Sequence, residues 1–508
     1  MTNSYLYTRR DFMSVTMLGA LGTSVCVGIG RASELQQWDP DKPLKRLGRP
    51  LRVQPVLMYK LPTPKPQTSW KSWGGVQTEN AVGQEVSRIT RELDQLQKQA
   101  DFPLNIRPVV KLNTEEAAVE LGRMDHDLTL LYACTGGGNM LRACLSAKPD
   151  AIVFVRHRSG PVYYWYEALS TAYLKMGKGA AGETGAGNVH VDDVVVDDQD
   201  ELLWRLRATA AVHNTRGTRI VALGGAWGKY APDAPEVAKR RFRIEIVDVG
   251  YEDFERRIRE LRNDSAVLSD AERWTRRYLA LPRTRLATDR RFVVNAFVLY
   301  LAFKELLEKH SATAFTIKSC MGTIIPMSET TACLTLELLN DEGLAAFCES
   351  DFVIIPAGLL LRHLSGKPVF LHNSTFPHKG TVTCAHCTCP RRLDGRKYEP
   401  ARIVTHYESD YGAAPKVEMP IGQVLTFIDP QYSTARWVGF TGKVRANPDY
   451  EICRSQQDVE IEGHWRRLVD EVRDSHWVAV YGDCLREAGY AARKFGIEFD
   501  GGGVIRDT

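Results

Sequence analysis

The stretch LTLLYACTGGGNMLRACLSAKPDAIVFV, residues 128–155, holds two apolar runs separated by a glycine-rich turn and a helix-like segment. Leu128–Cys134 is the first run, Met140–Ser146 has helical character, and Ala151–Val155 is the second run. Short apolar runs joined through a helix are typical of neighbouring parallel strands. This stretch therefore predicts an α/β fold built on a parallel sheet.

The same alternation extends outward in both directions. Towards the N-terminus the sequence predicts a strand, a helix and a strand at Leu51–Met58, Asn80–Gln99 and Leu104–Val110. A second unit opens near residue 185, with predicted elements at Asp198–Thr215, Arg219–Leu223, Phe242–Val247, Tyr251–Asn263 and Arg290–Lys309. Further on, Phe315–Ser319 and Cys333–Leu338 are strand-like. After residue 400, short β-like runs alternate with turns up to a helix at Cys484–Phe495, which predicts a largely antiparallel C-terminal part.

Composition excludes several classes of protein. A chain of 508 residues is too long for one core and predicts two to four domains. The formal charge of +4 is small and both signs are interspersed, so we expect no nucleic-acid partner. No stretch after residue 32 is long and apolar enough to cross a bilayer. The clusters Gly136–Gly138 and Gly224–Gly225 lack the G-x-G-x-x-G spacing of dinucleotide sites, so we interpret them as tight turns.

The N-terminus has the order of segments found in export signals. Arg9 and Arg10 precede a mildly apolar run, Val15–Gly30, and the small-residue exit site Gly30-Arg31-Ala32. The arginine pair resembles the twin-arginine type, whose route carries folded proteins that often hold a metal or cofactor. We therefore expect a signal at 1–32, a linker at 33–50, the twin-arginine export machinery as a partner, and a periplasmic or secreted protein. The alternatives are an N-terminal helix or a membrane anchor.

Residues 320–408 carry the densest chemistry, because polar groups follow three consecutive predicted strands. His372-Asn373 follow Val369–Leu371, and Cys384–Cys389 follow Thr381–Thr383. His406–Ser409 follow the third predicted strand, 401–405. Polar residues at the ends of consecutive strands meet at one rim of a sheet, where α/β proteins bind ligands. The sequence predicts a binding or catalytic site there.

Several motifs give this region a resemblance to a known superfamily. They are LNDEGLAAFCESD (339–351), LSGKPVFLHN (364–373), AHCTCPRRLDG (385–395), THYESDYG (405–412) and HWVAVYGD (476–483). The set resembles the fucose-isomerase-like branch of the L-fucose/L-arabinose isomerase superfamily. The resemblance implies two Rossmann-like parallel-sheet domains, at 51–184 and 185–312. It also implies a mixed α/β and antiparallel β-rich domain at 313–508.

The resemblance also implies an activity. Members interconvert aldoses and ketoses with a divalent metal, usually Mn²⁺, and are commonly oligomers, so we expect a homo-oligomer that acts on a deoxy sugar or pentose. Glu349 matches the family's first metal carboxylate, and Asn373 stands where the family has its second. His386 and His476 match histidines of the metal site.

Asn373 is a departure from the family pattern. An amide can coordinate a metal through its oxygen but cannot accept a proton at neutral pH. Either Asp351 or Glu408 supplies the missing base, or the chain has a different function. The alternatives are an exported carbohydrate-binding protein without turnover and another metal-dependent enzyme acting on glycan fragments. Glu349 and Asp351 could also simply cap the helix that follows them.

Two further features bear on ligands. Cys384, Cys387 and Cys389 form either a disulfide with one free thiol or a metal or redox site, and in the second case Zn²⁺ or Fe²⁺ competes with Mn²⁺. Cys144, Cys333 and Cys348 lie in apolar segments and are expected to be buried thiols. Trp73, in a loop, is a candidate for stacking on a sugar face, or else an anchor of that loop.

Overall fold

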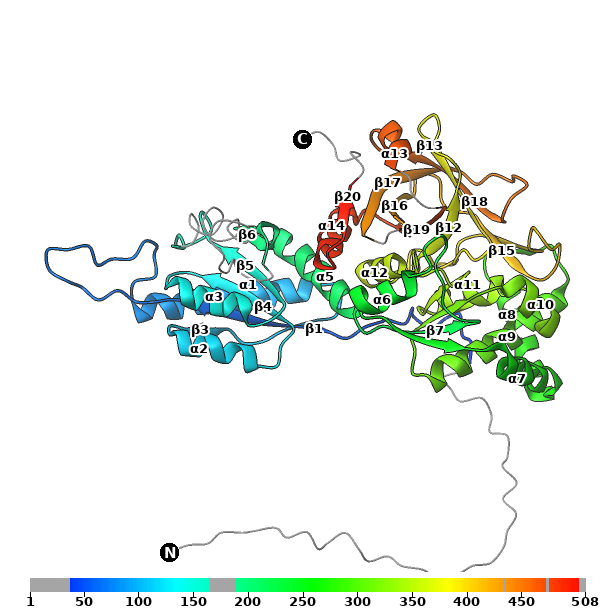
Figure 1. Cartoon of the computed structure of the whole chain (residues 1–508), viewed down its shortest axis with the longest axis horizontal. Helices are drawn as coiled ribbons and strands as arrows, with labels where there is room; N and C mark the ends of the chain where they lie inside the picture. The colour runs from blue at the N-terminus through cyan, green and yellow to red at the C-terminus, as the bar shows by residue number, and fades with distance from the viewer. Residues whose placement is uncertain (1–36, 165–188, 433–434, 472–474, 502–508) are drawn as a thin grey trace, which may run out of the picture. The chain divides into compact units, whose positions relative to one another are not determined.

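A computed structural model describes residues 37–164, 189–432, 435–471 and 475–501 (Figure 1). The predicted export signal at 1–32 and the first residues of the predicted linker lie outside this range, so the signal, its export partner and the location stay predictions. Within the described residues, no helix is long and apolar enough to cross a membrane.

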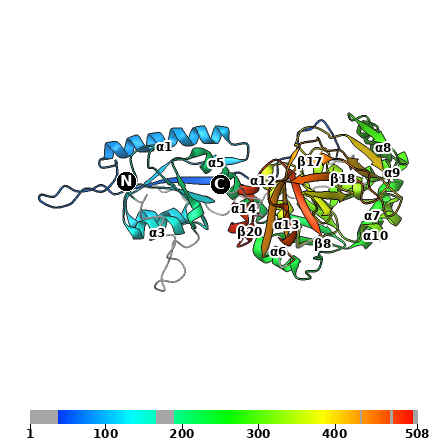
Figure 2. The ribbon, with the colours of Figure 1, turned by 90° about the horizontal axis from the view of Figure 1, so that it is seen from above.

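The first sheet is parallel throughout, with strand order β2-β1-β4-β5-β6 and β3 paired to β1. Its strands are β1 (Leu51–Met58), β2 (Leu104–Ile106), β3 (Val110–Leu112), β4 (Leu128–Ala133), β5 (Asp150–Val155) and β6 (Val194–Val196). Helices α1 (Glu79–Gln99) and α3 (Gly138–Ser146) lie on opposite faces of it (Figure 2). The short helices α2 (Glu115–Glu120), η2 (Leu121–Arg123) and η5 (Val191–Asp193) complete the unit.

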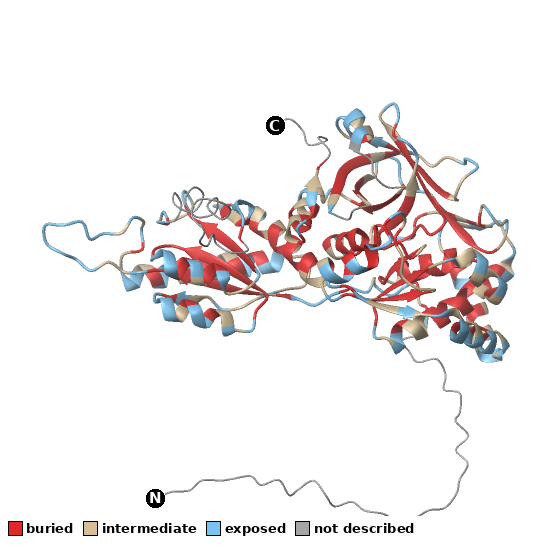
Figure 3. Ribbon diagram, viewed as in Figure 1, coloured by how far each residue is buried: buried red, intermediate tan, exposed pale blue. Residues whose placement is uncertain are grey.

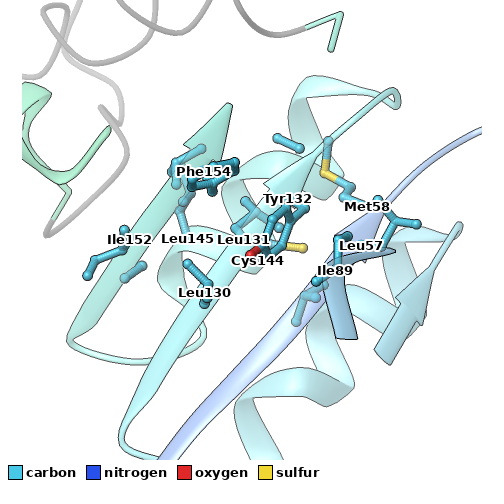
Figure 4. Packing of buried hydrophobic residues seen from close by; sticks show 14 of the residues in the cluster. Leu57, Met58, Ile89, Leu130, Leu131, Tyr132, Cys144, Leu145, Ile152 and Phe154 are labelled. Atoms are coloured by element: carbon cyan, nitrogen blue, oxygen red, sulfur yellow. The ribbon is translucent and has the colours of Figure 1, made fainter. Parts of the chain in front are cut away.

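The apolar runs that predicted this sheet are its core. All residues of β4 and β5 are buried, because helices cover both faces of the sheet. Tyr132 and Phe154 pack together on one face, and Leu131, the preceding residue of β4, lies on the other (Figure 4). The predicted tight turn joins β4 to α3. Gly136 has a φ of +144° there, and a Cβ would lie 2.4 Å from the Met140 side chain, so the turn requires glycine.

The second sheet is also parallel, with the order β11-β10-β7-β8. Its strands are β7 (Arg219–Leu223), β8 (Glu245–Val249), β10 (Ala314–Ile317) and β11 (Ala345–Phe347). The helices of this part are α5 (Gln199–Thr215), α6 (Ala234–Phe242), α7 (Tyr251–Asn263), α8 (Ser265–Leu279), α9 (Arg290–Lys309), α10 (Cys320–Ser328), α11 (Cys333–Asp341) and α12 (Ile355–Ser365).

One predicted strand in this part is wrong. Cys333–Leu338 begins helix α11, in which every residue is buried. A short segment that is buried on all sides shows no polar alternation, so its period cannot distinguish a strand from a helix.

The C-terminal part is an antiparallel sheet that closes on itself. The order β16-β19-β12-β13-β18-β17 returns to β16, because β16 and β17 also pair, and β20 adds to β17 in parallel. The strands are β12 (Phe370–Ser374), β13 (Thr381–His386), β16 (Val424–Pro430), β17 (Arg436–Ala446), β18 (Ser455–Ile461), β19 (His476–Tyr481) and β20 (Glu498–Asp500). Beside this barrel-like sheet lie α13 (Trp465–Glu471), α14 (Leu485–Lys494) and a small sheet of β9 (Thr284–Leu286), β14 (Ala401–Val404) and β15 (Ala414–Val417).

Helix α12 joins the second sheet to the barrel-like sheet through one apolar core. Leu359, Leu360 and Leu361 are fully buried and belong to a cluster with Phe347 of β11 and Val478 of β19. Figure 3 shows that buried residues run through the strands and helices of this part of the chain. Burial of each leucine stabilises the fold by about 1.5–3 kcal/mol. This shared core fixes the end of β11 against the strands β12, β13 and β19.

The chain is therefore a mixed α/β protein with parallel-sheet units and a C-terminal antiparallel, barrel-like sheet, as its sequence predicts. Strand β6, from residues 194–196, pairs with β5 of the first sheet. Strand β11, from residues 345–347, pairs with β10 of the second.

Candidate active site and thiol cluster

A cavity of about 720 Å³ lies where the second sheet and the barrel-like sheet meet. Its wall contains ionisable groups and cysteines from segments far apart in the sequence. The residues that line it are Trp227, Lys229, Lys318, Ser319, Cys320, Met321, Gly322, Cys333, Cys348, Glu349, Asn373, His386, Cys387, Thr388, His406, Glu408 and Cys453.

Glu349 reaches this cavity from an unusual turn after β11. Glu349 and Ser350 both have left-handed backbone, with φ of +64° and +54°. Such a conformation costs a non-glycine residue about 1–3 kcal/mol and persists only where neighbours hold it. The Trp227 indole N–H donates to the Glu349 carbonyl, and the Ser350 hydroxyl donates to the Gly225 carbonyl over 2.8 Å. The turn therefore keeps the Glu349 side chain directed into the cavity.

Two histidines compensate the Glu349 carboxylate. The His476 Nε2 atom lies 3.2 Å from Oε2, and the His386 Nε2 atom lies 3.7 Å from Oε1. Burial opposes ionisation, but the two imidazoles outweigh it and hold the pKa of Glu349 well below its usual range. The side chain keeps 38% of its exposure because it faces the cavity. It is an ionised, accessible carboxylate.

His476 is fixed from behind by a second carboxylate. Its Nδ1 atom lies 2.8 Å from Asp351 Oδ2, and both side chains are fully buried. Burial lowers the pKa of His476, but the hydrogen bonds to Asp351 and Glu349 outweigh it and raise the pKa to about 9. Asp351 also accepts backbone N–H groups from Lys229 and Val353. With Nδ1 bonded to Asp351, Nε2 is the atom directed to Glu349.

Asn373 lies beside this pair. It is directly opposite His476 in the register of β12 and β19, so the two residues share a face of the sheet. It lines the cavity together with His386, at the end of β13, and Glu408, in the segment after β14. The structure thus brings Glu349, Asn373, His386 and Glu408 to one cavity. His476 and Asp351 stand behind Glu349 rather than on the cavity wall.

The other residues singled out by sequence are placed differently. Of the three clustered cysteines only Cys387 lines the cavity, whereas Cys384 and Cys389 are buried elsewhere. Trp73 is 65% exposed and forms an edge contact with Tyr164, at 6.4 Å between ring centroids. It lies in the segment between β1 and α1 and is not among the residues that line this cavity.

A group that sequence reasoning missed lies on the same wall. One ligand atom each from Cys333, Cys387 and His406 lies within 4.8 Å of the others, and all three residues are buried, so they could hold a metal ion. The Cys453 thiol hydrogen-bonds with that of Cys387. We call these four residues the sulfur cluster. They come from four separate segments, so no local spacing motif could have revealed them.

A further thiol pair lies at the start of α10. Cys320 and Cys348 hydrogen-bond to each other. The Cys348 thiol lowers the pKa of Cys320, and the backbone N–H groups of Cys320 and Met321 at the helix N-terminus lower it further. Two lysines, Lys229 and Lys318, also line the cavity, and the Lys318 Nζ atom lies 5.7 Å from the centre of the Trp227 ring. The cavity can therefore offer carboxylates, imidazoles, ammonium groups and thiols to one ligand.

No known protein family matches this sequence, and no curated protein matches it.

Proposed function

We propose that this chain is a metal-dependent aldose–ketose isomerase acting on a deoxy sugar or pentose. The observation that carries the proposal is the Glu349 carboxylate, which a strained turn directs into a polar cavity and which His476 and His386 keep ionised. The resemblance of residues 339–351 and 364–373 to motifs of the fucose-isomerase-like branch is the second reason for the proposal.

The residues at Glu349 fit a hard divalent cation. Glu349, Asn373 and His386 line the cavity and supply a carboxylate oxygen, an amide oxygen and an imidazole nitrogen, which suit Mn²⁺ or Mg²⁺. His476, fully buried behind Glu349, would join them by releasing its Nε2 proton. Neighbouring ligands of an octahedral ion at about 2.1 Å stand about 3 Å apart. The Glu349 Oε2 and His476 Nε2 atoms are 3.2 Å apart, so this pair already has that spacing. Asp351 supplies the carboxylate behind the histidine that such sites use to orient the ring.

Isomerisation needs groups that accept and return a proton, and two carboxylates of the cavity are candidates for these roles. A bound cation would stabilise the negative charge that develops on the C1 and C2 oxygens. Glu349 is exposed to the cavity, so it can reach a bound sugar and is the first candidate for the group that accepts the proton from carbon. Glu408 lines the cavity and is the candidate for the second acid–base group, because Asp351 is fully buried against His476. Asp351 is instead a positioning residue.

Proton exchange tests this function directly. Protein reconstituted with Mn²⁺ is incubated with L-fucose, L-arabinose and related sugars in D₂O, and the products are followed by NMR. Ketose formation with deuterium at C1 or C2 supports the proposal. Exposed Glu260→Gln serves as the matched control for Glu349→Gln. Neither exchange nor product with any sugar of the panel would reject isomerase activity.

Asn373 favours a second candidate, an exported sugar-binding protein without turnover. A neutral ligand at this position removes a base and one negative charge from the site. Calorimetric binding of a sugar without exchange or product supports this candidate. Asn373→Asp separates the two, since restored exchange in this variant shows that only the missing carboxylate prevents turnover.

A further inference from the structure

We propose that the sulfur cluster is a zinc site, with Cys333, Cys387, Cys453 and His406 as its four ligands. Its four ligands are different residues from those at Glu349, and the inference does not depend on the sugar reaction. Its basis is the convergence of three thiols and one imidazole on one part of the cavity wall. Thiolate and imidazole are the ligands that Zn²⁺ prefers, and three cysteines with one histidine are a recurrent structural zinc set.

The spacing of the cluster suits a tetrahedral ion. With Zn–S bonds of about 2.3 Å, two sulfur ligands of a tetrahedral zinc ion stand about 3.8 Å apart. The ligand atoms of Cys333, Cys387 and His406 lie within 4.8 Å of one another. The distances between these ligand atoms need to shorten by at most about 1 Å to surround an ion, which small side-chain rotations can provide.

Cys453 supplies the fourth ligand. Its side chain packs against Cys333 and Cys387, and its thiol hydrogen-bonds with the Cys387 thiol. It also lines the cavity with the other three residues. Four protein ligands close the coordination sphere, so we assign this ion a structural role rather than a catalytic one.

The backbone around the cluster is well held. Cys333 begins α11, and the N–H of the next residue, Leu334, donates to the Ala413 carbonyl beside β15. Cys387 directly follows β13, and Cys453 precedes β18, the strand that pairs with β13. The N–H of His406 donates to the Tyr411 carbonyl over 2.9 Å. Ligands on such fixed segments form a preorganised site, and an ion there would tie α11 to three strands.

The sulfur cluster and the residues around Glu349 should bind different metal ions, because their ligand atoms differ in softness. Soft thiolates select Zn²⁺, whereas carboxylate and amide oxygens accept Mn²⁺ or Mg²⁺. Each cysteine that binds the ion releases its proton, so zinc uptake by the cluster acidifies a weakly buffered solution. That proton release is a readout independent of any enzyme activity.

The test uses the purified full chain with its metal removed and then reloaded with one equivalent of Co²⁺, a spectroscopic substitute for Zn²⁺. We expect an intense sulfur-to-cobalt charge-transfer band, displaced by one equivalent of Zn²⁺. Cys387→Ser should lose the band and weaken zinc binding by at least about 100-fold, since loss of even an outer partner of a metal ligand costs about 10–100-fold. Cys384→Ser is the matched control, because Cys384 lies in β13, three residues before Cys387, is buried and does not line the cavity.

Two outcomes overturn the proposal. One is a folded wild-type protein that gives no charge-transfer band, a result that does not depend on the folding of any variant. The other is a Cys387–Cys453 or Cys333–Cys387 disulfide found by mass spectrometry of the alkylated, natively produced protein. Glu349→Gln separates this inference from the proposed isomerase, because it should abolish exchange and leave the cobalt–sulfur band unchanged.

Discussion

The two chemical groups on the cavity wall are stabilised in opposite ways. Glu349, His476 and Asp351 form a chain of paired charges, held by a turn with two left-handed residues. The sulfur cluster instead consists of thiols and one imidazole in packed surroundings next to Ala414. Each charged group of the first set has an oppositely charged partner within the protein. The thiols form only weak hydrogen bonds with one another and would form strong bonds with a metal ion. Our two proposals therefore assign a reaction to the first group and a structural role to the second.

The largest expected effect is on the charged chain. Glu349→Gln removes the only carboxylate that contacts both His386 and His476 within the described residues. Acid–base groups contribute about 10²–10⁴-fold, so sugar proton exchange should fall by that factor while the circular dichroism spectrum is unchanged. Undiminished exchange in D₂O would transfer the role of base to another group, Glu408 first.

The next effect concerns stability. His476→Ala leaves the buried carboxylate of Asp351 without its imidazole, and breaking such a buried pair costs about 3–5 kcal/mol. Urea unfolding should register this loss as a lower midpoint. Cys453→Ser, in apo protein, removes no charge and should cost clearly less. Equal losses in the two variants would show that the charged and thiol groups do not differ as argued.

His126, beside β4 of the first sheet, is a buried histidine that does not line the cavity. His126 bonds to the Met124 carbonyl and the Thr129 hydroxyl rather than to a carboxylate. Burial, with Lys148 nearby, lowers its pKa to about 4. The folded pKa is below the unfolded value of about 6.5, so the unfolded chain binds more protons and stability falls as pH drops from about 6.5 to about 4.

The expected loss at His126 is about 1–3 kcal/mol, measured as the urea midpoint against pH. His126→Gln should reduce the fall of the urea midpoint at low pH, whereas the same change at exposed His378 should leave that fall unchanged. If the urea midpoint of His126→Gln falls at low pH as much as that of the wild type, other groups cause the loss of stability.

The smallest effect tests the turn itself. Trp227→Phe keeps the ring but removes the N–H that bonds to the Glu349 carbonyl, a loss of about 1 kcal/mol. A looser turn should weaken Mn²⁺ binding at Glu349 while the cobalt–sulfur band stays as in the wild type. A change in that band as well would mean that the two groups are mechanically coupled.

Much of the fold could be predicted from apolar periodicity. Leu51–Met58, Arg219–Leu223, Tyr251–Asn263 and Arg290–Lys309 are predicted with the bounds that the structure gives them. These segments carry either a continuous buried run or a clear helical stripe. Helix α11, Cys333–Asp341, is also a continuous buried run but has no helical stripe, so its sequence pattern does not distinguish it from a buried strand.

The site divides in the same way. Glu349 and Asn373 lie in stretches whose resemblance to a known superfamily predicted a role for them, and the structure brings both to one cavity. Cys333, His406 and Cys453 come from segments separated by dozens of residues, and only the folded chain brings them to Cys387. Clustered cysteines near residue 384 drew attention to two thiols, Cys384 and Cys389, that do not line the cavity.

The closed strand order of the C-terminal sheet has a practical consequence for protein engineering. Each strand of the ring has a partner on both sides, through to the β16–β17 pairing, so its register does not rely on a capping element. The largely exposed turn between β12 and β13, residues 375–380, carries none of the residues that line the cavity and can therefore be diversified in a library while the frame keeps its shape. That makes this ring a scaffold on which new specificities could be selected.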